Sequence, residues 1–114
     1  MDNCIFCKII SREIPSDIVY EDDKILAFKD VNPIAPVHVL IVPKEHIASA
    51  MDINDDNADV VAHIFKKASC IAEKMGVSEN GFRIVNNCGK DGGQTVMHLH
   101  FHMLAGRSMK WPPG

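Results

Sequence analysis

Polar and apolar residues alternate most regularly from His98 to Leu104, in the run His-Leu-His-Phe-His-Met-Leu. Such alternation predicts a half-buried β-strand. Because successive side chains of a strand point to opposite faces, we expect His98, His100 and His102 to share one face. The opposite face, expected to enter the core, carries Met97, Leu99, Phe101 and Met103.

Shorter apolar runs predict further strands, over residues 18–20, 25–29, 38–42 and 81–87. A turn at residues 21–24 joins the first two runs into a hairpin. The two prolines of residues 30–36 exclude a central strand and indicate a loop. A glycine-rich turn leads from the last run into the histidine strand and predicts a second antiparallel hairpin.

Helical spacing of apolar residues predicts one long helix, roughly over residues 55–75. Its periodic residues are Val61, Ile64, Phe65, Ala68, Ile71, Ala72 and Met75. Residues 52–57 offer N-cap candidates with acidic side chains, and Gly76 marks the stop. Residues 4–10 predict a short helical turn. His63 lies within the long helix without an obvious partner, and we interpret it as a surface or packing residue.

Strands grouped around one main helix, rather than alternating with helices, predict an α+β fold with an antiparallel sheet. The length of 114 residues indicates a single domain, residues 1–114. A net charge of −3 argues against non-specific binding to a nucleic-acid backbone. No apolar run reaches the ~20 residues of a membrane helix, and the N-terminus lacks the features of a signal peptide. We therefore expect a cytoplasmic protein that binds neither nucleic acid nor membranes.

The four cysteines are expected to be reduced in that compartment, so a disulfide framework is not predicted. Cys4 and Cys7 form a C-x-x-C pair, which is typical of a metal site or of a redox pair. We interpret Cys70, in the long helix, and Cys88, in a loop, as inert thiols. The proline-rich tail carries the only tryptophan, Trp111, which we expect to dock on another surface.

Three histidines on one strand face can act on a phosphorylated ligand. A rise of ~3.3 Å per residue places neighbouring imidazoles roughly 6.5–7 Å apart, too far for hydrogen bonds between them. One ring can then attack a ligand while its neighbours contact other parts of it. Attack of a neutral His100 on phosphorus predicts a phospho- or nucleotidyl-histidine intermediate that water hydrolyses. The alternative is a metal site, although the even, flat spacing makes it awkward for a single ion to touch all three rings.

The glycine-rich turn before the histidines carries candidate phosphate ligands. Its backbone N–H groups, together with Asn87, Gln94 and Thr95, can bind phosphate oxygens. Gly92-Gly93 taken alone indicates only a plain hairpin turn. The sequence lacks G-x-x-x-x-G-K-[ST], so a P-loop is excluded.

Residues 98–104 resemble the H-φ-H-φ-H-φ-φ signature of the histidine-triad (HIT) superfamily, in which φ is hydrophobic. The resemblance extends over nearly the whole chain and points to the Hint branch. These are the purine nucleoside phosphoramidases once described as protein kinase C inhibitor-like. The matching segments are residues 28–31, 35–38, 42–47, 91–95 and 111–114.

The resemblance implies a HIT fold: a five-stranded antiparallel sheet with one long and one short helix. It implies a homodimer whose two sheets join into one of ten strands. It also implies hydrolysis of the P–N bond in adenosine or guanosine 5′-phosphoramidates, and turnover of aminoacyl-adenylates. His100 would be the nucleophile, and His102 would contact the phosphate and assist the leaving amine. His38 would be a fourth active-site histidine that orients the triad, which His98 opens.

The same resemblance implies the nucleotide contacts. Asp30 would bind the ribose hydroxyls, with Phe28 and Val31 beside the base. His100, His102 and the three loop side chains named above would contact the phosphate region. Trp111 would approach the partner subunit's site, and Lys44 would assist the turnover of acyl-adenylates.

The C-x-x-C pair departs from many Hint proteins. It resembles the zinc pair of bacterial members and of galactose-1-phosphate uridylyltransferases. There a histidine like His46 and the first histidine of the triad, here His98, complete the site. Two thiolates and two imidazoles make a closed tetrahedral structural zinc site. With zinc bound by Cys4, Cys7, His46 and His98, the last is a metal ligand rather than a direct catalyst. The alternative is reduced, unmetallated cysteines.

Other functions fit the same residues. The dinucleoside polyphosphate hydrolases of the superfamily share the triad, but the W-P-P-G ending and the D-G-G-Q loop speak against them. Related uridylyltransferases carry Gln in place of the third histidine, whereas this chain has His102. A nucleotide-binding adaptor, whose work is protein contact, would have the same site. A small zinc-binding structural protein would bind no nucleotide.

Overall fold

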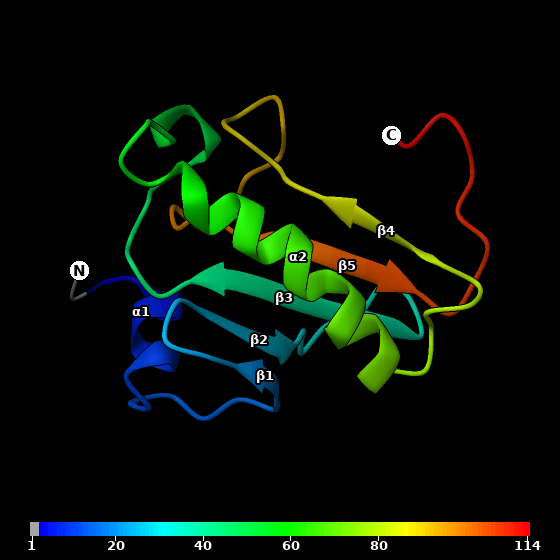
Figure 1. The fold of residues 1–114 in the computed structure, drawn as a ribbon. Coiled ribbons are helices and arrows are strands. Elements are labelled where there is room, and N and C mark those ends of the chain that lie inside the picture. The colour runs from blue at the N-terminus through cyan, green and yellow to red at the C-terminus, as the bar shows by residue number, and fades with distance from the viewer. Residues whose placement is uncertain (1–2) are drawn as a thin grey trace.

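A computed structural model describes residues 3–114 and confirms the expected α+β fold (Figure 1). The elements are α1 (Ile5–Ile10), β1 (Ile18–Glu21), β2 (Ile25–Lys29), β3 (Val37–Pro43), a 3₁₀ turn η1 (Ala50–Asp52), α2 (Ala58–Lys74), β4 (Phe82–Val85) and β5 (Phe101–Ala105). The strands form one five-stranded sheet in the order β1-β2-β3-β5-β4, and every neighbouring pair is antiparallel. No helix within residues 3–114 is long and apolar enough to cross a membrane.

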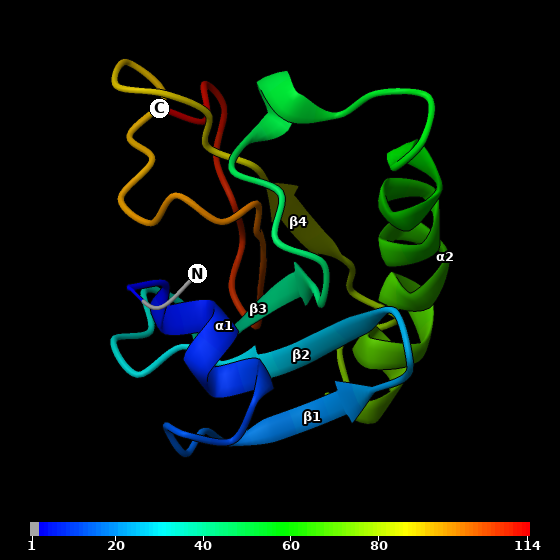
Figure 2. The same cartoon turned by 90° about the vertical axis from the view of Figure 1, so that its left-hand side faces the viewer.

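The central strands are buried on both faces because a helix lies on each side of the sheet (Figure 2). Alternate residues of β2 point to opposite sides: Ile25 and Ala27 pack with α2, whereas Leu26 and Phe28 pack with α1. A strand covered on both faces reads as a continuous apolar run. This explains why residues 25–29 and 38–42 lack the alternation that marks a half-buried strand.

The histidine strand is shorter than predicted. β5 begins at Phe101, so His102 lies in the strand, whereas His98 and His100 lie in the irregular segment before it. The N–H of Leu99 donates to the carbonyl of Ile47 at 2.6 Å, which ties this segment to the loop after β3. Leu99, Phe101 and Met103 are buried as expected.

One other sequence-based expectation was wrong. Met97 does not enter the core, since its side chain is 54% exposed. His63 has a partner: its Nε2 lies 2.7 Å from Oδ2 of Asp22, which joins α2 to the turn between β1 and β2. This contact links residues 41 positions apart, and nothing in the local pattern of the helix indicates it.

Candidate functional site

A chain of hydrogen bonds fixes the proton on two imidazoles at the centre of the sheet. The N–H of Ile34 donates to Nδ1 of His38 at 3.2 Å, so the proton of this ring is on Nε2. That Nε2–H donates to Nδ1 of His102 at 2.9 Å, and Oδ2 of Asp30 lies 3.4 Å from the same nitrogen. His102 therefore keeps its own proton on Nε2, the nitrogen that remains free to meet a ligand.

His100 has the opposite tautomer. Its Nδ1 lies 2.7 Å from the carbonyl oxygen of His98 and donates to it, so its Nε2 carries a free lone pair. The carbonyl of His100 accepts a hydrogen bond from Nδ2 of Asn86 at 2.9 Å, which anchors the backbone of this residue. A buried imidazole with a fixed tautomer and an unprotonated Nε2 is a competent nucleophile.

The surroundings keep His38 and His102 neutral. Burial is the main cause that lowers the pKa of His38, and Asp30 opposes it only in part. Burial, followed by repulsion from His100 and His38, lowers the pKa of His102 to about 4. The rings of His100 and His102 have centroids 5.1 Å apart, closer than a flat strand allows, because His100 lies before the strand begins. A proton on one ring therefore raises the free energy of a proton on the next.

These groups face a cavity of about 360 Å³ that has an apolar wall and a polar end. The wall includes Phe6, Ile9, Ile14, Phe28 and Leu40, and the polar end includes Asp30, Thr95, His100 and His102. A neighbouring cavity of about 380 Å³ shares Asp30 and His102 and adds His38 and Asn87. Most of the predicted site residues thus meet around two adjoining hollows. Val31 lines the first, although its side chain is 89% exposed.

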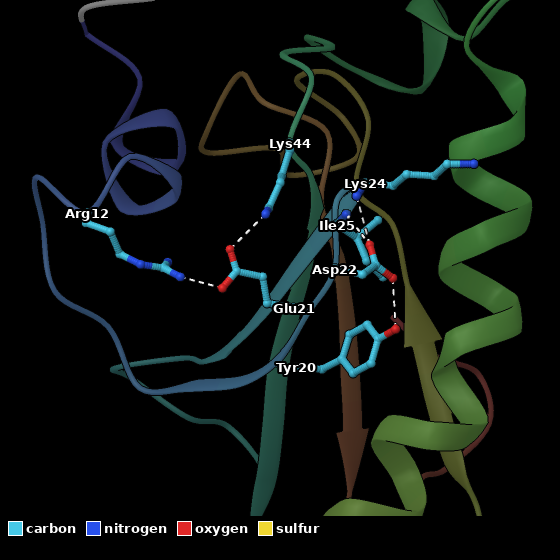
Figure 3. A network of polar contacts seen from close by, with 7 residues as sticks. All are labelled: Arg12, Tyr20, Glu21, Asp22, Lys24, Ile25 and Lys44. Atoms are coloured by element: carbon cyan, nitrogen blue, oxygen red, sulfur yellow. Dashed lines mark hydrogen bonds and ion pairs between the residues drawn. The ribbon is translucent and has the colours of Figure 1, made fainter.

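Three predicted residues lie elsewhere in this chain. The side-chain amide of Gln94 accepts from the N–H of Gly89 and donates to the carbonyls of Ala48 and Val96, so it fixes the loop. The ammonium of Lys44 pairs with Glu21 at 2.8 Å, outside both hollows (Figure 3). Trp111 is 84% exposed.

Sequence reasoning missed Phe6 and Asn86. From the sequence, Phe6 is expected only as part of a helical turn. Its position between two candidate metal ligands is a signal that could have pointed to the site. Asn86 acts through a backbone carbonyl 14 residues away, and no local pattern announces such a contact.

A second group of polar side chains lies at the start of α1. Cys4, Cys7, His46 and His98 place one ligand atom each within 4.8 Å of all the others. Sγ of Cys4 lies 3.3 Å from Nδ1 of His98, and Sγ of Cys7 lies 3.4 Å from Nδ1 of His46. The two Nδ1 atoms are 3.1 Å apart. We call these four residues the Cys₂His₂ cluster.

The Cys₂His₂ cluster fits zinc. Tetrahedral zinc with ordinary bond lengths separates two nitrogens by about 3.3 Å and a nitrogen from a sulfur by about 3.6 Å, close to the distances found. Nε2 of His98 lies 2.9 Å from the carbonyl oxygen of Pro43 and donates to it, which leaves Nδ1 unprotonated for a metal. Burial, followed by Cys4, raises the pKa of Cys7 to about 11, so a metal must displace protons from the thiols to bind.

The antiparallel sheet and its cluster of imidazoles define a protein of the histidine-triad class. Residues 11–109 match the sequence profile of the HIT domain. The chain therefore belongs to the HIT domain family.

Three similar proteins illustrate this membership. The crystal structure of a HIT family hydrolase from Legionella pneumophila has a TM-score of 0.95 and 52% identity, and the match covers 98% of this chain and 100% of that one. A histidine triad nucleotide-binding protein from Candida albicans has a TM-score of 0.82 and 36% identity, over 96% and 83% of the two chains. The 14 kDa zinc-binding protein of Brassica juncea is 46% identical over 96% of this chain and 98% of its own length. The hydrolase relative is consistent with the imidazoles at the cavity, and the zinc-binding relative is consistent with the Cys₂His₂ cluster.

Proposed function

We propose that this protein hydrolyses the P–N bond of purine nucleoside 5′-phosphoramidates, and also turns over aminoacyl-adenylates, through a nucleotidyl intermediate on His100. The observation that carries the proposal is the 2.7 Å hydrogen bond from Nδ1 of His100 to the carbonyl of His98. This hydrogen bond keeps the proton of His100 on Nδ1 and leaves the lone pair of Nε2 free beside the cavity. The hydrolase relative supports the reaction class, and the nucleotide-binding relative supports the ligand class.

The proposed reaction has two steps. Nε2 of His100 bonds to phosphorus as the P–N bond breaks, and the nitrogen leaves as an amine. The Nε2–H of His102 donates a hydrogen bond to that nitrogen, and solvent supplies the proton with which the amine leaves. Water then attacks phosphorus, the bond to His100 breaks, and the nucleoside monophosphate leaves as the water releases a proton. The lowered pKa of His102 keeps this ring neutral at pH 7, which supports its role as a hydrogen-bond donor.

The proposed nucleotide lies with its base against the apolar wall beside Phe28 and Val31. Asp30, at the junction of the two hollows, accepts from the ribose hydroxyls. Thr95 and Asn87 contact the phosphate region, and Gln94 supports it by holding the loop.

We also propose that the Cys₂His₂ cluster holds one structural zinc ion. The donor set is closed, with four protein ligands and no position for substrate. Free thiols of this kind stay reduced in the cytoplasm, where we place the protein. A homodimer, with Trp111 reaching the partner's site, would account for an indole that is 84% exposed in the single chain.

The deciding experiment is hydrolysis of an adenosine 5′-phosphoramidate, with intact-mass measurement of a quenched reaction. The wild type is expected to turn over and to carry a nucleotidyl adduct. His100→Ala is expected to lose both, with a rate at least about 100-fold lower because the nucleophile is gone. His63→Asn, a histidine outside both hollows, serves as the matched control and should keep the adduct.

The same assay separates the competing functions. Faster turnover of a dinucleoside polyphosphate than of the phosphoramidate would reassign the protein to those hydrolases. No turnover and no adduct, in folded protein that still binds AMP, would replace the proposal with a nucleotide-binding adaptor. Folded protein that binds zinc but no nucleotide would leave a structural role only.

A further inference from the structure

Phe6 touches more of the site than any sequence pattern suggests. Its ring lies edge-on to His100, with centroids 5.0 Å apart and planes at 79°. It packs in the same way on His98, at 5.8 Å and 77°, and on Phe28, at 5.7 Å and 67°. The side chain is 6% exposed. One buried ring therefore contacts a ligand of the Cys₂His₂ cluster, the nucleophile and the apolar wall of the cavity.

The contact with His100 matters because little else fixes that ring. Its Nδ1–H···O bond to His98 defines one direction, but a single hydrogen bond leaves rotation about that direction open. The other ring that contacts His100 is that of His102, with centroids 5.1 Å apart. Edge-to-face packing favours one interplanar angle. Phe6 thus supplies the second constraint that aims Nε2.

The position of Phe6 depends in turn on the Cys₂His₂ cluster. Phe6 lies between Cys4 and Cys7, and both thiols contact Nδ1 of His98, at 3.3 and 3.6 Å. Helix α1 has only six residues, too short to be stable by itself. Its attachment to the sheet is therefore made by the cluster at one end and by the apolar contacts of Phe6 and Ile9 on the sheet.

We infer that Phe6 is a positioning residue that holds the ring of His100 in its attacking orientation and connects that orientation to the Cys₂His₂ cluster through α1. The inference rests on the proposed function in one respect, that His100 is the nucleophile. It predicts that the ring of Phe6, rather than its apolar volume, sets the rate of the first chemical step.

The test compares Phe6→Leu with Phe28→Leu in single-turnover experiments at saturating adenosine 5′-phosphoramidate. Both variants remove a ring from the same cavity wall, but of these two rings only that of Phe6 packs on His100. Phe6→Leu is expected to form the nucleotidyl adduct at least about tenfold more slowly, since small misplacements of a reacting atom carry large rate costs. Phe28→Leu is expected to raise KM and keep the saturated rate. Phe6→Tyr, which keeps the ring, is expected to restore the rate.

A second readout needs no turnover. The ¹⁵N resonances of the His100 ring report which nitrogen carries the proton. Because a ring that rotates leaves the carbonyl of His98 part of the time, these resonances are expected to show one tautomer in the zinc-loaded wild type and averaging of the two tautomers in Phe6→Leu and in wild type stripped of zinc by a chelator. Bound zinc, measured by mass spectrometry, is expected to stay at the wild-type level in Phe6→Leu.

Two results would overturn the inference. One is a Phe6→Leu variant with the wild-type saturated rate and the wild-type ¹⁵N spectrum. The other is a variant in which KM alone changes, which would make Phe6 a binding residue only. If the wild type itself forms no adduct, the proposed function fails, and the spectra of wild type and Phe6→Leu still decide the role of Phe6.

Discussion

Three imidazoles of the site have one nitrogen bonded to a backbone group, which determines what the other nitrogen can do, and His102 is fixed through one of these three. The carbonyl of Pro43 takes the Nε2–H of His98 and leaves Nδ1 for a metal. The carbonyl of His98 accepts from the Nδ1–H of His100 and leaves the lone pair of Nε2 free for the proposed attack on phosphorus. The N–H of Ile34 fixes the tautomer of His38, and the Nε2–H of His38 then fixes the tautomer of His102. The backbone therefore decides which atom of each ring can react.

At this scale, the lowered pKa of His102 predicts an acid-sensitive fold. The folded protein binds a proton on this ring only near pH 4, whereas the unfolded chain binds it near pH ~6.5. Its contribution to stability is thus complete above pH ~6.5 and is lost as the pH falls toward 4. His102→Asn is expected to reduce the loss of unfolding free energy between pH 7 and pH 5 by about 2 kcal/mol, measured by urea unfolding. Equal losses in variant and wild type would contradict this assignment. The groups that face the ring, His38, His100 and Asp30, are unchanged in sequence in this variant.

Among the elements, α2 and the hairpin of β1 and β2 share a network of hydrogen bonds centred on one carboxylate. Asp22 accepts hydrogen bonds from the hydroxyl of Tyr20 at 2.8 Å and from the N–H groups of Lys24 and Ile25 (Figure 3). Nε2 of His63 lies 2.7 Å from the same carboxylate. Burial alone would raise the pKa of Asp22, but these bonds, led by the one from His63, hold it well below its usual range. The hydrogen bond to Asp22 raises the pKa of Tyr20 to about 12.

This network predicts a cost for removing the imidazole. His63→Ala is expected to lower the free energy of unfolding by about 1–2 kcal/mol, because it breaks a hydrogen bond to a charged group between two elements. Urea unfolding at pH 7 measures it. Lys66→Ala, an exposed change on the same helix, should alter stability by less than about 0.5 kcal/mol. Equal effects of the two changes would show that the contact contributes nothing.

The elements also show what the sequence could predict. The strand at residues 25–29 was predicted with its observed bounds, because both of its faces meet helices and its apolar run is local information. The histidine strand was predicted too long because contacts distant in sequence, such as Leu99 with Ile47 and His98 with Cys4, pull its first half away from the sheet. The residue types of the site followed from spacing and resemblance. The tautomers of the imidazoles could not be predicted from the sequence, since they depend on backbone carbonyls that only the fold brings near the rings.

At the scale of the whole molecule, an edge strand and an indole lie exposed within residues 3–114. β4 is an edge strand of the sheet, and Phe82 at its start is 39% exposed. The tail leaves Trp111 at 84% exposure, although Nη2 of Arg83 binds the carbonyl of Lys110 at 3.0 Å and holds the tail near β4. An exposed edge and an exposed indole on neighbouring segments fit the proposed dimer better than an isolated chain.

The dimer proposal makes a kinetic prediction. Trp111→Ala is expected to keep the mass of a dimer in analytical ultracentrifugation and to change the kcat/KM ratio between two phosphoramidates with different leaving amines by about fivefold or more, since the loss of a buried aromatic contact costs on the order of 1 kcal/mol. Ser108→Ala, in the same tail, is the control. An unchanged ratio, or a monomer in the wild type, would remove Trp111 from the neighbouring site.

The donors of the Cys₂His₂ cluster span almost the entire chain, and this has a consequence for synthesis. Cys7 precedes His98 by 91 residues, so a ribosome adding about 5–20 residues per second exposes the thiols some 5–20 s before the last imidazole is made. During that interval the nascent chain carries two cysteines that have no complete set of partners. Capture of a metal by all four donors must therefore wait until His98, just before β5, has been made, so the helix that is made first is attached through the cluster only when the chain is nearly complete.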